Sequence, residues 1–179
     1  MTDSAINYGE ALYELAKEEQ LSEQILSELD AVCGMFGKNP DYLRLLSEPS
    51  VPKKERCAVL DEAFRGKLQP YLLNFLKLLC ERGIIRQTAD CLRAYRSRYY
   101  AENGILEVTA VSAVALTEAQ KSRLQDKLQT VTGKRVALQL RTDSTVLGGI
   151  RLQMDGKELD GTVRSRLDGL RRKLSDTVL

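Results

Sequence analysis

The spacing of apolar residues changes once along this chain, close to Asn103-Gly104. Before that point apolar residues recur at intervals of three and four, which is the spacing of one face of an α-helix. After it they alternate with polar residues, which is the pattern of a β-strand with one covered face. Because a turn signal separates the two patterns, we expect two domains, residues 1–104 and 105–179.

The first half is predicted to be helical throughout. Asn39-Pro40, and Ser50 with Pro52, each place a capping side chain before a proline suited to a first helical turn. A further helix is expected from about Pro70 to Arg82, ending at Gly83, since glycine readily takes the left-handed conformation that closes a helix. With short connections between the segments, this half is expected to form an all-α six-helix bundle.

The second half is predicted to be a small α+β domain. Strands are expected around residues 106–110, 136–140 and 150–154, where apolar and polar residues alternate. Thr117 and Gln120 form a capping box, which opens a helix that runs to Gly133. Asp155-Gly156 is a hairpin signal that leads into a short strand near Leu159. A last helix is expected from about Gly161, with its apolar residues spaced four, three and four apart: Val163, Leu167, Leu170 and Leu174.

The composition argues against an enzyme. The chain has no histidine and no tryptophan, so imidazole bases and His-ligated metals are excluded. Neither of the glycine-rich phosphate-binding patterns, GxGxxG or GxxxxGK(S/T), occurs in the chain. Gly148-Gly149 is expected to form a backbone bulge or a close approach of two chain segments at the start of a strand. The four cysteines are widely spaced among apolar residues, so we expect buried, reduced thiols and neither a metal site nor a cofactor. They are Cys33, Cys57, Cys80 and Cys91.

Nucleic-acid binding through the second domain is the main alternative function. Residues 105–179 carry 13 basic and 9 acidic side chains, and the predicted last helix holds five of the cations. Proteins that bind single-stranded nucleic acid or RNA stack bases on aromatic rings. This region has no aromatic residue, which argues against that kind of binding. The apolar seam of the last helix is suited to packing on its own sheet, to a coil with another helix, or to both.

Two predicted helices carry more apolar surface than one core face requires. Beside Tyr8, Leu12 and Leu15, the first helix has a second apolar set of Ile6, Gly9 and Tyr13. The helix around residues 70–82 is apolar on almost every side. Such a pair is either the centre of the bundle or the two walls of a groove that accepts a third helix.

Three segments resemble the delta subunit of bacterial F-type ATP synthases, the family called OSCP in mitochondria. They are Tyr8–Ala16, the spaced set from Val136 to Leu152 that includes Thr142, Asp143, Val146, Gly148 and Gly149, and Asp160–Leu167. The resemblance spans nearly the whole chain in order. This sequence departs from the family pattern at Gly9, where Ala is usual, at Thr162, where Ser is usual, and at Ile84, where Arg is frequent. From helix propensity, Gly9 is expected to weaken the first helix by up to about 1 kcal/mol.

The resemblance implies a non-catalytic stator subunit on the cytoplasmic face of the bacterial plasma membrane, associated with the membrane only indirectly through the complex. It implies that the first domain binds the N-terminal helix of an alpha subunit of the catalytic headpiece. The second domain would contact the b subunits of the peripheral stalk, with no role for nucleic acid. The residues expected to bind the alpha subunit are Tyr8, Ala11, Leu12, Leu15, Asn74, Leu78 and Leu79.

Overall fold

A computed structural model describes residues 3–146, 148–154 and 157–161 of the chain. The chain forms two compact units, Met1–Tyr99 and Tyr100–Leu179, which are described separately. The division lies a few residues before the predicted boundary at Asn103-Gly104, inside a helix that continues to Glu102. No helix in the described ranges has both the length and the apolar character that crossing a membrane requires.

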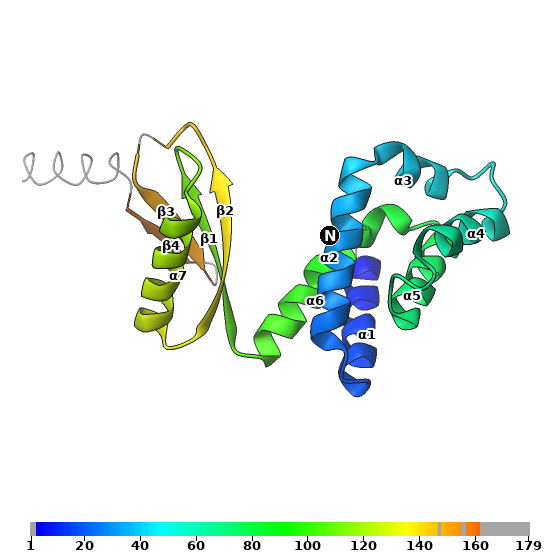
Figure 1. Cartoon of the computed structure of the whole chain (residues 1–179), viewed down its shortest axis with the longest axis horizontal. Helices are drawn as coiled ribbons and strands as arrows, with labels where there is room; N and C mark the ends of the chain where they lie inside the picture. The colour runs from blue at the N-terminus through cyan, green and yellow to red at the C-terminus, as the bar shows by residue number, and fades with distance from the viewer. Residues whose placement is uncertain (1–2, 147, 155–156, 162–179) are drawn as a thin grey trace, which may run out of the picture. The chain divides into compact units, whose positions relative to one another are not determined.

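The N-terminal unit is helical (Figure 1). Its elements are α1 (Asp3–Glu18), α2 (Ser22–Lys38), α3 (Pro40–Ser47), α4 (Lys53–Phe64), α5 (Pro70–Glu81), the 3-10 helix η1 (Ile85–Gln87) and α6 (Thr88–Glu102). Gly83 ends α5 with a φ of +73°, as predicted. The described part of this region therefore holds seven helical segments, one more than the six expected. The additional one, η1, is a single tight turn that buries Ile85 completely between α5 and α6.

The two predicted N-caps are wrong. The side chain of Asn39 donates to the carbonyl of Met35 over 3.0 Å, so it serves the end of α2 and not the start of α3. Only one residue separates these helices, and the exposed carbonyls of α2 compete for the same side chain. Ser50 donates to the carboxylate of Glu48, and α4 begins at Lys53 without a side-chain cap.

One apolar core joins the helices of the N-terminal unit. Its side chains come from the predicted helical stripes, with Tyr13 and Tyr95 the largest that are fully buried. The two rings meet edge to face at 5.4 Å between centroids, and Tyr95 donates to the carbonyl of Ser22 over 2.9 Å. The core therefore fixes α1, α2 and α6 together.

The C-terminal unit contains a small mixed sheet with a helix on one face (Figure 1). Its elements are β1 (Ile105–Ser112), α7 (Glu118–Thr132), β2 (Arg135–Thr142), β3 (Ile150–Met154) and β4 (Lys157–Asp160). The strand order is β2-β1-β3-β4, with β1 parallel to β2 and the other pairs antiparallel. The predicted capping box forms at Thr117, and Gly133 ends α7 in the left-handed conformation. The predicted last helix and the Asp155-Gly156 turn lie outside the described residues, although β3 and β4 pair as the hairpin signal requires.

Candidate functional site

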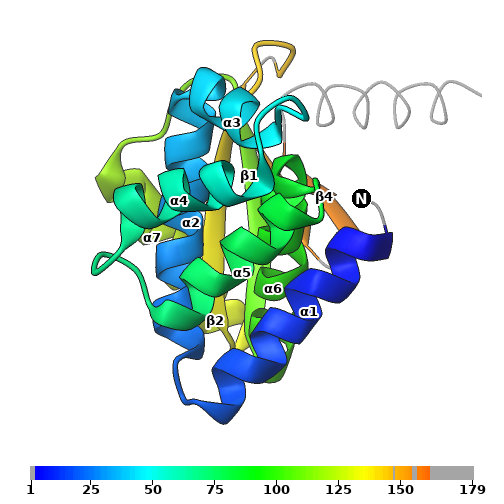
Figure 2. The same cartoon turned by 90° about the vertical axis from the view of Figure 1, so that its right-hand side faces the viewer.

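An apolar groove of about 410 Å³ lies between α1 and α5 in the N-terminal unit. The two helices can be followed in Figure 2. Each helix contributes four lining residues with the same i, i+3, i+4, i+7 spacing, so each set is one helix face over two turns. The residues are Tyr8, Ala11, Leu12 and Leu15 from α1, and Tyr71, Asn74, Phe75 and Leu78 from α5.

The structure brings together six of the seven residues that were predicted to bind a partner. The seventh, Leu79, does not line the groove, because its side chain is fully buried in the core. Tyr71 and Phe75 line the groove but were not predicted. The spacing along α1 would have found both, because the same pattern projected back from Leu78 selects Asn74, Phe75 and Tyr71.

The floor of the groove is buried and its rim is exposed. Leu12 and Phe75 are 3% and 8% exposed, so they belong to both the core and the groove. Leu15 and Leu78 each retain 37% exposure, which is high for large apolar side chains on facing helices. Such partly exposed leucines are typical of a surface that a second apolar surface covers.

One end of the groove is fixed by a polar contact. The hydroxyl of Tyr71, at the start of α5, hydrogen-bonds Glu19, which follows the end of α1, and this contact raises the pKa of Tyr71. The start of one helix thus meets the end of the other, so α1 and α5 run antiparallel along the groove (Figure 2). Asn74 is the one amide among the groove-lining residues.

Gly9 and Tyr13, from the second apolar set of α1, face α6 and do not line the groove. Gly9 lies so close to α6 that a Cβ added to it would be 2.4 Å from the carbonyl oxygen of Cys91 and 2.8 Å from the Cβ of Ala94. Tyr13 is buried against Tyr95 of the same helix. The expectation that Gly9 merely weakens the first helix is therefore incomplete, because the missing Cβ permits this close approach.

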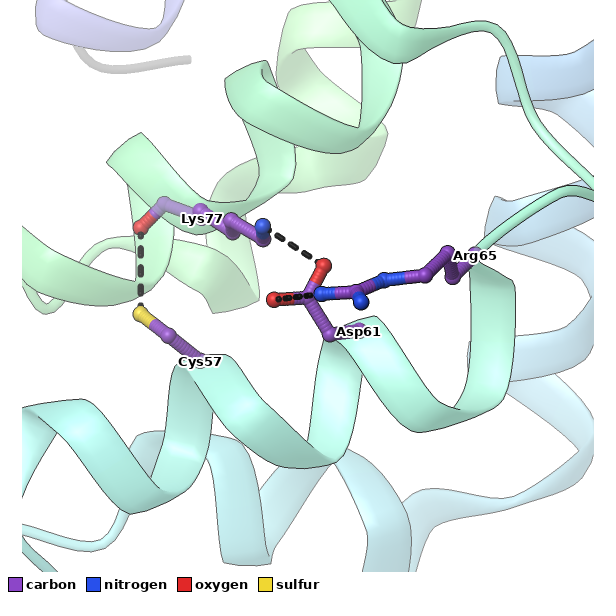
Figure 3. Close-up of polar contacts among 4 residues, drawn as sticks. All are labelled: Cys57, Asp61, Arg65 and Lys77. Atoms are coloured by element: carbon purple, nitrogen blue, oxygen red, sulfur yellow. Dashed lines mark hydrogen bonds and ion pairs between the residues drawn. The ribbon is translucent and has the colours of Figure 1, made fainter.

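A charged cluster holds α5 against α4 (Figure 3). The ammonium of Lys77 on α5 lies 2.6 Å from Asp61 Oδ1 on α4, and Arg65 lies 3.3 Å from Oδ2. The thiol of Cys57 contacts the carbonyl of Lys77 at 4.0 Å. The hydrogen bond from Lys77 is the main cause that lowers the pKa of Asp61. These groups are paired with one another, so they position the α5 wall of the groove.

The four cysteines lie in the core of the helical unit or pack against it. All four are free; Cys80 and Cys91 are buried, and Cys33 and Cys57 are partly buried. Burial raises the pKa of the Cys33 thiol to about 12 and that of Cys91 to about 11, which disfavours the nucleophilic thiolate. Within the described ranges no three His, Cys, Asp or Glu side chains gather as metal ligands would.

The chain is similar along nearly its whole length to proteins of one family. The family model described as "ATP synthase delta (OSCP) subunit" matches residues 5–174. A protein of Clostridioides difficile (strain 630) named ATP synthase subunit delta is 31% identical over 175 residues, which is 97% of each chain. A protein of the same name from Fusobacterium nucleatum is 30% identical over 165 residues, covering 92% of this chain and 94% of the relative.

Solved structures share the fold at lower sequence identity. A chain in the cryo-EM structure of the Toxoplasma gondii mitochondrial ATP synthase hexamer superposes with a TM-score of 0.76 and 20% identity, covering 97% of this chain and 98% of that one. A chain in a Polytomella F-ATP synthase structure gives a TM-score of 0.52 at 16% identity over 57% of this chain and 90% of that one. A helical N-terminal region followed by a small mixed sheet is thus a fold found in ATP synthases.

Proposed function

The chain belongs to the ATP synthase delta (OSCP) subunit family, and we propose that its α1–α5 groove binds the N-terminal helix of an alpha subunit of the catalytic headpiece. As a member of this family it is a stator-type structural subunit of ATP synthase and is not itself catalytic. The groove residues supply the contact that such a subunit needs.

The observation that carries the proposal is the pair of matched apolar faces on α1 and α5. Two helices that each present an i, i+3, i+4, i+7 face leave a trough that a third amphipathic helix can fill. Each face spans eight residues, from i to i+7, or about 10 Å, so the occupant needs two to three helical turns. The exposed parts of Leu15 and Leu78 would then be buried, and apolar burial contributes about 25 cal/mol per Å².

The C-terminal unit, in our proposal, contacts the b subunits of the peripheral stalk on the cytoplasmic face of the plasma membrane. The helical region, residues 1–104, acts on the headpiece, and residues 105–179 act on the stalk. The division of the chain into two compact units supports this assignment, because a tether between two partners needs two separate contact surfaces. Rotation exerts torque on the headpiece, and the tether resists it if neither contact dissociates under load.

The substitution Ala11→Asp tests the groove. Ala11 is exposed on the groove wall, so an aspartate there leaves the core intact but places a carboxylate where the bound helix would exclude water. Because an unpaired buried charge costs several kcal/mol, we expect a synthetic peptide of the alpha N-terminal helix to bind more than about 100-fold more weakly. Isothermal titration calorimetry measures this loss.

The matched control is Asn7→Asp. Asn7 is exposed on the same helix but does not line the groove, so it adds one negative charge to α1 without placing it in the interface. This variant is expected to bind the peptide about as tightly as the wild type. Equal affinities for wild type and Ala11→Asp would remove α1 from the interface and overturn the proposal.

A further inference from the structure

Asn74 is a hydrogen-bonding position on the wall of an apolar groove. The other described residues that line the groove are alanine, leucine, phenylalanine and tyrosine, and none of them is charged. An asparagine amide carries two N–H donors and a carbonyl acceptor. Asn74 is exposed, and its side chain makes no hydrogen bond with any residue in the described part of the chain. In the free protein its amide is therefore solvated by water.

Asn74 lies between the two ends of the groove. The hydroxyl of Tyr71 bonds Glu19 at one end. Because α1 and α5 run antiparallel, Tyr8 and Leu78 lie at the other end, where a tyrosine hydroxyl can keep its contact with water. Along the axis of α5, Asn74 is about 4.5 Å from Tyr71 and about 6 Å from Leu78. A helix that fills the groove from end to end therefore passes over Asn74 and removes water from its amide.

The packing of α5 holds Asn74 in place. Leu72 and Leu76, two residues before and after it, are fully buried in the core. Lys77, the next residue along α5, is paired with Asp61 of α4 over 2.6 Å. A rotation of α5 that carried the amide away from the groove would expose the two leucines and break this pair. Asn74 therefore meets a bound helix at a fixed point.

The amide of Asn74 stays paired only if the bound helix supplies a hydrogen-bonding group. Covering an unpaired amide lowers affinity by about tenfold or more, because the amide loses its bonds to water. Within an α-helix the backbone N–H and C=O groups are already bonded to one another, so the group must come from a side chain. A charged side chain is disfavoured, since none of the described groove-lining residues carries a charge to offset its desolvation.

We propose that the helix held in the groove carries one amide or hydroxyl side chain that bonds Asn74, and that this bond fixes the position of the helix along the groove. The inference rests on the proposed function and adds what the bound helix must present. Apolar contacts alone do not fix that position, because the apolar residues of an amphipathic helix recur at each turn, about every 5.4 Å. A helix displaced by one turn would place an apolar side chain against Asn74. A single buried asparagine sets the register of coiled coils in the same way.

Isothermal titration calorimetry of the full-length chain tests the proposal by a double-mutant cycle. The probe is a synthetic peptide of the alpha N-terminal helix, prepared unmodified and with each of its amide and hydroxyl residues replaced by alanine in turn. Each peptide is titrated into the wild type and into Asn74→Leu, which leaves the core intact because Asn74 is exposed. We expect one alanine peptide to bind the wild type about tenfold more weakly than the unmodified peptide does, and to bind Asn74→Leu without that loss.

The matched control is Asn7→Leu, the same substitution at an exposed position of α1 that does not line the groove. It is expected to bind every peptide as the wild type does. If each alanine peptide lost the same factor with the wild type and with Asn74→Leu, the proposal would be overturned, although the groove itself would still bind the helix. Coupling of Asn74 to peptide residues more than one turn apart would contradict a single register. Failure of the unmodified peptide to bind the wild type would overturn both this proposal and the proposed function.

Discussion

Replacing Gly9 by alanine tests whether α1 owes its position to a close approach to α6. The added Cβ would lie 2.4 Å from the carbonyl oxygen of Cys91, about 1 Å nearer than an ordinary carbon–oxygen contact. Backbone atoms must move to relieve this overlap, at a cost near the upper end of the 1–3 kcal/mol typical of overpacking. Alanine returns about 1 kcal/mol through its higher helix propensity. We therefore expect the free energy of unfolding to fall by about 2 kcal/mol.

Urea unfolding followed by tyrosine fluorescence measures this change. The chain has no tryptophan, and six of its seven tyrosines lie in the unit Met1–Tyr99 while the seventh, Tyr100, lies on α6, so the signal reports mainly on the helical unit. Gly34→Ala in α2 is the matched control, since a Cβ there meets nothing within 4 Å. It is expected to stabilise the unit by up to about 1 kcal/mol. If Gly9→Ala stabilised the unit as Gly34→Ala does, the close approach of α1 and α6 would be refuted.

Three further predictions concern the groove, the thiols and the charged cluster. Leu78→Ala is expected to weaken binding of the alpha-subunit peptide about fivefold to tenfold with little change in the urea midpoint, because Leu78 is partly exposed; a large loss of stability at unchanged affinity would contradict its place on the rim. Iodoacetamide labelling of Cys33 and Cys91 in the folded chain should be slow at pH 8 and still accelerating at pH 10, and rapid labelling at pH 8 would contradict their raised pKa values. Lys77 lowers the pKa of Asp61 in the folded chain. The ionised carboxylate therefore stabilises the fold at pH values above the pKa of Asp61 in the unfolded chain, and this stability is lost as the pH falls through the pKa of Asp61 in the folded chain. The free energy of unfolding should therefore fall more steeply below about pH 4 in the wild type than in Asp61→Asn, and equal slopes in urea titrations would argue against the pairing.

Periodicity was sufficient to predict most of the elements, because burial of one face leaves a direct trace in the sequence. The helical stripes of α1 and α2 and the alternation of β1, β2 and β3 all became elements of the predicted type. The capping box at Thr117 was predictable because it is local: both of its hydrogen bonds connect residues three positions apart.

Features that depend on distant neighbours could not be predicted in this way. Arg56 looks like one of several cations at the start of α4, yet it is buried and donates to the carbonyls of Leu46 and Val51. The role of Gly9 depends on α6, more than 80 residues away along the chain. The side chain of Asn39 could bond the end of α2 or the start of α3, and only the structure shows that it bonds α2.

The candidate groove shows the same limit on a smaller scale. Sequence reasoning selected the two helices that line the groove, but it included Leu79, which is buried in the core, and omitted Tyr71 and Phe75. Because α5 is apolar on almost every side, its composition does not distinguish the face that packs inward from the face that lines the groove. In the structure the inward face of α5 is the one that buries Leu72, Leu76 and Leu79 completely.

A structure of the assembled ATP synthase that contains this chain tests the central claim most directly. We predict that an amphipathic helix from the N-terminus of an alpha subunit lies between α1 and α5, covering Leu15 and Leu78 and contacting Tyr8 and Tyr71. An assembly in which this groove is open to solvent, with the headpiece held through another surface of the helical unit, would contradict the account.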